Sequence, residues 1–85
     1  MNGHHKNQFV VNTREHLRAV RGAYSVALEL YNIGDYSAAD TLFESLRLNI
    51  RHLLNDNSFK LDSYENTLLV RYYLMASSLI RGGGE

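Results

Sequence analysis

A chain of 85 residues is long enough for one domain with a small core, because area scaling predicts that it buries only about 64% of its unfolded surface. Nine basic and nine acidic residues cancel, so no global field attracts nucleic acid or an anionic membrane, and any such role requires a local patch. Cysteine is absent, which excludes disulfides and thiolate metal sites, and we expect a cytoplasmic protein.

The first segment, residues 1–11, is expected to be a flexible arm. Met1–Gln8 is polar, unlike a signal peptide, and no apolar run approaches the ~20 residues that cross a bilayer, so no membrane partner is predicted. His4 and His5 are adjacent but lack the further ligands of a metal site, so no metal is predicted. The apolar residues Phe9–Val11 are expected to fold back onto the core, or else to pair with a partner as an extended segment.

A first helix is predicted from near Thr13 to the residues before Gly34. Asn12 and Glu15 have the spacing of a capping box. The apolar positions that follow step by three and four, and they are Leu17, Val20, Tyr24, Ala27 or Leu28, and Tyr31. Gly22 lies mid-helix at a cost of roughly 1 kcal/mol relative to alanine, which we interpret as a site where another helix crosses closely.

Three arginines share the polar face of this first helix. Arg14, Arg18 and Arg21 have a spacing that suits phosphates along a groove, and we treat them as candidate phosphate contacts. A solvated helix face is the simpler interpretation. Positive charge near a helix start opposes the macrodipole, however, so the functional interpretation stays open.

A helical hairpin is predicted at Gly34 and Asp35. Glycine tolerates the left-handed conformation that ends a helix, and the aspartate carboxylate caps the next one, predicted over 36–55. The core positions of this second helix are Ala39, Leu42, Phe43, Leu46, Ile50, Leu53 and Leu54. Leu48 lies on its polar side and indicates a partner.

A third helix is predicted from the Asp62 and Glu65 capping box to Arg81, with the glycine-rich residues 82–85 as a tail. Apolar residues occupy most of its circumference. This apolar surface is larger than the two other helices can cover. We therefore predict a homodimer or a partner-bound state. The predicted interface residues are Tyr64, Leu68, Tyr72, Tyr73, Met75, Leu79 and Ile80.

Catalytic chemistry is not predicted. His16 and His52 stand outside any recognisable arrangement of nucleophile, base and orienting carboxylate. Phosphate loops, paired catalytic carboxylates and zinc spacings are also missing from the sequence. We predict no catalytic residue, no cofactor and no enzyme activity.

Two resemblances follow from these residues. The run Gly34, Asp35, Tyr36, Ala39 and Phe43 resembles the centre of a tetratricopeptide-repeat hairpin, although only one such unit is visible. The chain also resembles the small enterobacterial two-component connector proteins, the AriR/YmgB-type biofilm and acid-resistance regulators. The residues that carry this second resemblance are Gly34, Asp35, Leu42, Phe43, Ser45, Leu46, Lys60, Asp62, Thr67 and Leu68. It implies a short helical protein that dimerises and acts as a regulator.

The sequence thus predicts an all-α, three-helix domain over 12–81. The leading functional hypothesis is a regulatory or adaptor protein that acts by protein–protein interaction, as a connector-type regulator of bacterial signalling or biofilm formation. Three alternatives stay open: a DNA-binding transcription modulator, a tetratricopeptide-like chaperone for a secreted or assembling subunit, and a small-ligand-binding protein.

Overall fold

Three helices make up the part of the chain that the computed structural model describes, residues 2–56 and 61–81. They are α1 (Asn2–Asn32), α2 (Tyr36–Asn55) and α3 (Ser63–Leu79). The described residues contain no strand, so the prediction of an all-α, three-helix chain is confirmed.

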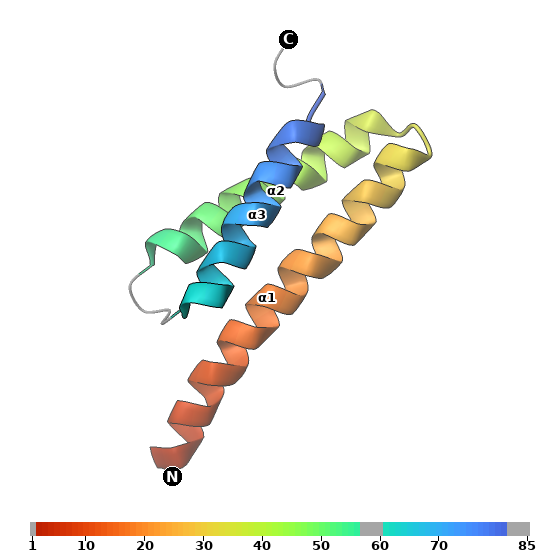
Figure 1. Cartoon of the computed structure of the whole chain (residues 1–85). Helices are drawn as coiled ribbons and strands as arrows, with labels where there is room; N and C mark the ends of the chain where they lie inside the picture. The colour runs from red at the N-terminus through yellow and green to blue at the C-terminus, as the bar shows by residue number, and fades with distance from the viewer. Residues whose placement is uncertain (1, 57–60, 82–85) are drawn as a thin grey trace.

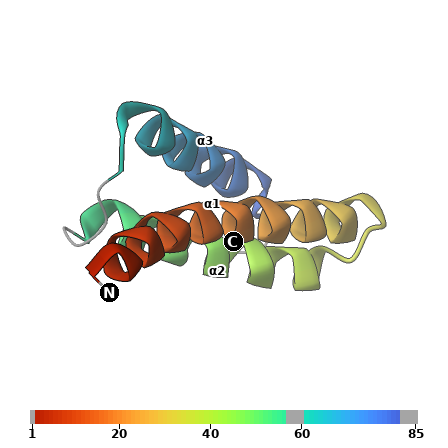
Figure 2. The same ribbon diagram turned by 90° about the horizontal axis from the view of Figure 1, so that it is seen from below.

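The helices run up, down and up, with α1 and α2 side by side as an antiparallel pair (Figure 1). Seen from below, α3 crosses the α1–α2 pair at an angle (Figure 2). It packs more extensively against α2 than against α1. The result is an elongated molecule of 49 × 20 × 17 Å in which α1 reaches past the ends of both other helices.

The start of α1 differs from the prediction. The helix begins at Asn2, so the predicted start near Thr13 is wrong and residues 2–11 belong to the helix. Asn12 therefore lies inside the helix and is not its N-cap. The chain has no proline to stop a helix upstream of the apparent capping box, and a local three-residue pattern does not by itself interrupt one. The histidine pair and the side chains of residues 9–11 lie outside the described side chains.

The hairpin between α1 and α2 forms as predicted. Gly34 has φ +89°, a left-handed conformation that costs glycine little. The main-chain N–H of Asp35 donates to the carbonyl of Leu30 at 2.9 Å, and that of Gly34 to the carbonyl of Tyr31 at 3.1 Å, as in a Schellman motif. The Asp35 carboxylate then accepts the N–H of Ala38 at 3.3 Å and starts α2 at the predicted residue.

The capping box of α3 is also confirmed. The Asp62 carboxylate accepts the N–H of Glu65 at 2.8 Å, and the Glu65 carboxylate accepts the N–H of Asp62 at 3.0 Å. The helix ends at Leu79, two residues before the predicted end at Arg81. The predicted glycine stop at 82–84 lies outside the described residues.

The core lies where the three helices meet, and α2 contributes most of it. Its buried residues are Val20, Ala27, Ala39, Phe43, Leu46, Ile50, Leu53, Leu69 and Ala76. Each helix contributes one fully buried alanine, which lets the backbones approach closely. Among the described residues no second helix crosses closely at Gly22, because a Cβ added there meets nothing within 4 Å. The predicted reason for this glycine is therefore wrong within the described chain.

Candidate functional site

The predicted interface residues of α3 separate into an exposed and a half-buried group. Tyr64 is 71% exposed. The other predicted residues are half-buried, and those that pack against the internal core are Tyr72, Tyr73, Leu79 and Ile80. Much of the predicted interface therefore stabilises the fold of the single chain.

Three side chains of α3, of which only Tyr64 is a predicted interface residue, face away from the core. Tyr64, Val70 and Leu74 are 71%, 43% and 60% exposed, and together we call them the outer face of α3. The buried residues Leu69 and Ala76, seven positions apart, mark the inward side of the same helix. The sequence prediction left out Val70 and Leu74, because a helix that is apolar nearly all round does not reveal which side turns inward.

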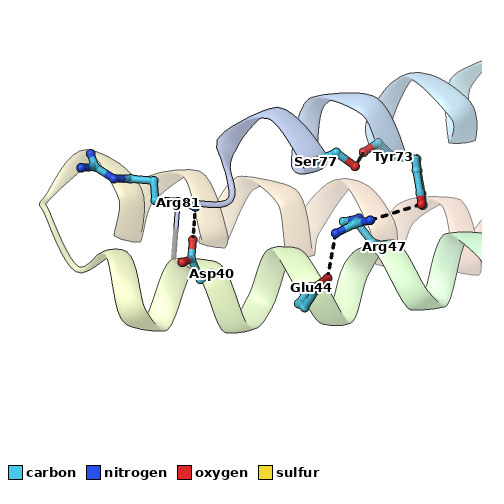
Figure 3. Close-up of polar contacts among 6 residues, drawn as sticks. All are labelled: Asp40, Glu44, Arg47, Tyr73, Ser77 and Arg81. Carbon is cyan, nitrogen blue, oxygen red and sulfur yellow. Dashed lines mark hydrogen bonds and ion pairs between the residues drawn. The ribbon is translucent and has the colours of Figure 1, made fainter. Parts of the chain in front are cut away.

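A polar cluster of Arg47, Glu44 and Tyr73 joins α2 to α3 (Figure 3). Arg47 donates through Nη1 to Glu44 Oε1 at 3.0 Å and through Nη2 to the Tyr73 hydroxyl at 3.4 Å. The hydrogen bond from Arg47 holds the pKa of Tyr73 below its usual value, and the same bond, together with Glu44, raises the pKa of Arg47. Arg47 therefore stays protonated, paired with the Glu44 carboxylate, while its bond to Tyr73 joins α2 to α3.

The C-terminal end of α3 is held by a second contact with α2. The main-chain N–H of Arg81 donates to Asp40 Oδ1 at 3.0 Å (Figure 3). The Arg81 guanidinium lies 4.0 Å from the ring centroid of Tyr36, a cation–π distance, and Tyr36 meets Tyr31 edge to face. These contacts of Arg81 with Asp40 and Tyr36 anchor the C-terminal end of α3 on α2.

The arginines proposed as phosphate contacts lie along an open groove. Arg14, Arg18 and Arg21 of α1 are exposed. They line two shallow hollows of about 460 and 510 Å³, which adjoin because Arg18 and Arg21 line both. Tyr72 of α3 lines the larger hollow, which also includes Gly22. We call these two hollows the arginine groove.

The floor of the arginine groove is apolar and aromatic. Leu17 lines one hollow, while Leu28 and Tyr24 line the other, and all three are half-buried. The Tyr24 and Tyr72 rings meet edge to face with centroids 5.3 Å apart, which joins α1 to α3 beneath the groove. The structure thus brings the candidate phosphate contacts together with Tyr72, a residue that the sequence assigned to a separate interface.

Among the described residues that line the groove, the charged side chains are all arginines. Of the residues that the structure describes, none that lines either hollow carries a carboxylate. Over the described side chains, residues 14–56 and 61–81, its three arginines form no ion pair. Their charges are therefore available to an anionic group that enters the groove.

The described residues offer neither a metal cluster nor a membrane span. None of their histidines and carboxylates gather in threes at a position where a metal ion could bind. None of their helices combines the length and the apolar character needed to cross a membrane. His52 lies on the surface 3.8 Å from the carboxylate of Asp56, one turn further along the chain. The absence of enzyme activity stays a prediction.

No protein-family model matches this chain, and no curated protein and no solved structure matches it. The resemblances to connector proteins and to a tetratricopeptide hairpin therefore stay predictions. Function has to be inferred from the two surfaces described above, the outer face of α3 and the arginine groove.

Proposed function

We propose that this protein is a non-enzymatic adaptor or regulator that acts by protein–protein contact and self-associates through the outer face of α3. The observation that supports this is the exposure of Tyr64, Val70 and Leu74 on one helix. Burying apolar surface is worth about 25 cal/mol per Å², so covering these side chains favours association. Exposed apolar groups gathered on one element are typical of interaction sites.

The neighbours of the outer face also suit a helix–helix contact. Thr67 and Ser78 are exposed and lie three or four residues from Val70 or Leu74, so they share its side of the helix. Both are short enough to let a second helix approach. Arg71 is the one charged residue between them. In a two-fold dimer each copy presents the same patch, and α3 packs on its counterpart.

The test is the mass of the protein in solution, measured by size-exclusion chromatography with light scattering across a range of concentrations. We expect a dimer for the unaltered chain and a monomer for Leu74→Glu, because an unpaired carboxylate buried in the contact is costly. The matched control is Val26→Glu on α1, where the valine is 51% exposed and lies outside the outer face. A monomer at every concentration, or a dimer that survives Leu74→Glu, contradicts the proposal.

A further inference from the structure

We propose that the arginine groove, which runs along α1 and reaches Tyr72 of α3, binds an acidic amphipathic helix of a partner protein. This inference rests on the proposed adaptor role but uses a different surface, so self-association and partner binding can succeed or fail separately. Four observations carry it: the row of arginines, the lack of carboxylates among the described residues that line the groove, its apolar floor, and a glycine that packing within the described chain does not explain.

The charge of the groove selects an acidic occupant. Arg14, Arg18 and Arg21 lie at positions i, i+4 and i+7, which spreads them over roughly 10 Å of helix. Guanidinium groups bind carboxylates through paired hydrogen bonds, and these three have no ion-pair partner among the described side chains. A partner helix with acidic residues on successive turns can meet all three.

The floor of the groove favours a peptide over a nucleic acid. Leu17, Leu28 and the paired rings of Tyr24 and Tyr72 present apolar and aromatic surface along α1 and at its contact with α3. A helix with leucines on one side covers that surface, whereas the phosphate backbone of a duplex has no apolar side to place there. The net charge of zero also provides no long-range attraction for DNA.

Gly22 points to a close approach of the occupant. Glycine in a helix interior costs roughly 1 kcal/mol relative to alanine, yet a Cβ at Gly22 meets nothing within 4 Å. The residue is exposed and lines the larger hollow of the groove beside Arg18 and Arg21. A partner helix that crosses α1 at this point can pack directly on its backbone, and this provides the reason for the glycine that internal packing does not.

The experiment measures binding of a fluorescently labelled synthetic peptide by anisotropy. The peptide has about 16 residues, or four to five helical turns, with leucines along one face and glutamates beside them. A second peptide has glutamine at every glutamate position. We expect saturable binding of the glutamate peptide and at least about tenfold weaker binding of the glutamine peptide, because charge-assisted hydrogen bonds are lost. Failure of the glutamate peptide to bind overturns the proposal.

Two sets of variants assign the binding to the groove. The double variant Arg18→Gln and Arg21→Gln should weaken binding about tenfold or more, whereas Arg51→Gln, at an exposed arginine of α2, should leave it unchanged. Gly22→Gln should weaken binding without lowering the melting temperature, while Ala19→Gln places the same side chain on α1 outside the two hollows and should have no effect. Equal effects of either variant and its control contradict the assignment.

Further measurements distinguish peptide binding from DNA binding, and groove binding from self-association. A labelled DNA duplex that binds more tightly than the glutamate peptide, and loses binding in the double arginine variant, overturns the proposal in favour of nucleic acid. Leu74→Glu should keep peptide binding, and the double arginine variant should keep the dimeric mass. A monomeric protein that still binds the peptide contradicts only the proposed self-association. A dimer that does not bind the peptide contradicts only the proposed role of the groove.

Discussion

Arg47 of α2 donates a hydrogen bond to the hydroxyl of Tyr73 on α3, and its guanidinium carbon lies 5.3 Å from the centroid of the same ring. One cation thus contacts both the polar and the aromatic part of a single tyrosine. Glu44 holds the guanidinium from the other side at 3.0 Å. The geometry makes the ionisation of Tyr73 a probe of the α2–α3 contact.

Tyr73 should ionise at a lower pH than an ordinary tyrosine, because the hydrogen bond from Arg47 lowers its pKa. The absorbance difference between the unaltered chain and Tyr73→Phe should show one tyrosinate forming below the reference value of about 10. Arg47→Met should return the pKa of Tyr73 toward its ordinary value. An unshifted difference curve contradicts the contact.

The same shift determines how stability depends on pH. The folded-state pKa of Tyr73 lies below the unfolded value, so ionisation favours the folded state. This contribution is absent near neutral pH, appears as the pH rises through the folded-state pKa, and is complete above the unfolded value. The free energy of unfolding of the unaltered chain relative to Tyr73→Phe should therefore increase as the pH approaches about 10.

Two glycines should respond in opposite ways to the same substitution. Gly34→Ala should lower the free energy of unfolding by about 1 kcal/mol or more, because φ at this position is +89°. Gly22→Ala should raise it by up to ~1 kcal/mol, because the added methyl group meets nothing within 4 Å and favours the helix. Urea denaturation of the two variants measures both, and a shift of the same sign for the pair contradicts the assigned conformations.

The elements that the sequence predicts correctly are those with local causes. Gly34, Asp35 and the Asp62–Glu65 box act through atoms within a few residues, so their pattern is sufficient to place α2 and the start of α3. The start of α1 is missed for the same reason. Asn12 and Glu15 have the local spacing of a cap, but nothing upstream prevents the helix from continuing.

The candidate surfaces depend on relations that a linear pattern does not contain. The row Arg14, Arg18 and Arg21 is visible in the sequence, but the larger hollow of the groove also needs Tyr72, which meets Tyr24 across two helices. The outer face of α3 becomes apparent only when the inward side is known, because apolar residues surround this helix. Periodicity identifies a face when the opposite face is polar, and α3 lacks that contrast.

The free energy of unfolding should depend on the cap residue of α3, Asp62. It should change little when the replacement can still accept a hydrogen bond. Asp62→Ala removes the acceptor for the N–H of Glu65 and should cost about 1 kcal/mol. Asp62→Asn keeps an acceptor oxygen and should cost much less. The comparison is made by chemical denaturation, and equal losses for alanine and asparagine would show that the cap does not stabilise α3.

Burial, and not hydrophobic character alone, should decide the cost of removing a large side chain from α2. Phe43 is fully buried and its ring lies 5.8 Å from that of Tyr24, so Phe43→Ala should cost about 3–5 kcal/mol. Leu48 is 62% exposed on the same helix, and Leu48→Ala should change stability by no more than about 0.5 kcal/mol. Domains of this size have total stabilities of roughly 4–13 kcal/mol, so Phe43→Ala should be near its unfolding threshold at physiological temperature.

Thermal denaturation followed by circular dichroism compares the two variants, and similar losses would mean that α1 and α2 do not enclose Phe43. A large loss for Leu48 alone would instead assign that side chain to a contact between copies, because the single chain leaves it uncovered.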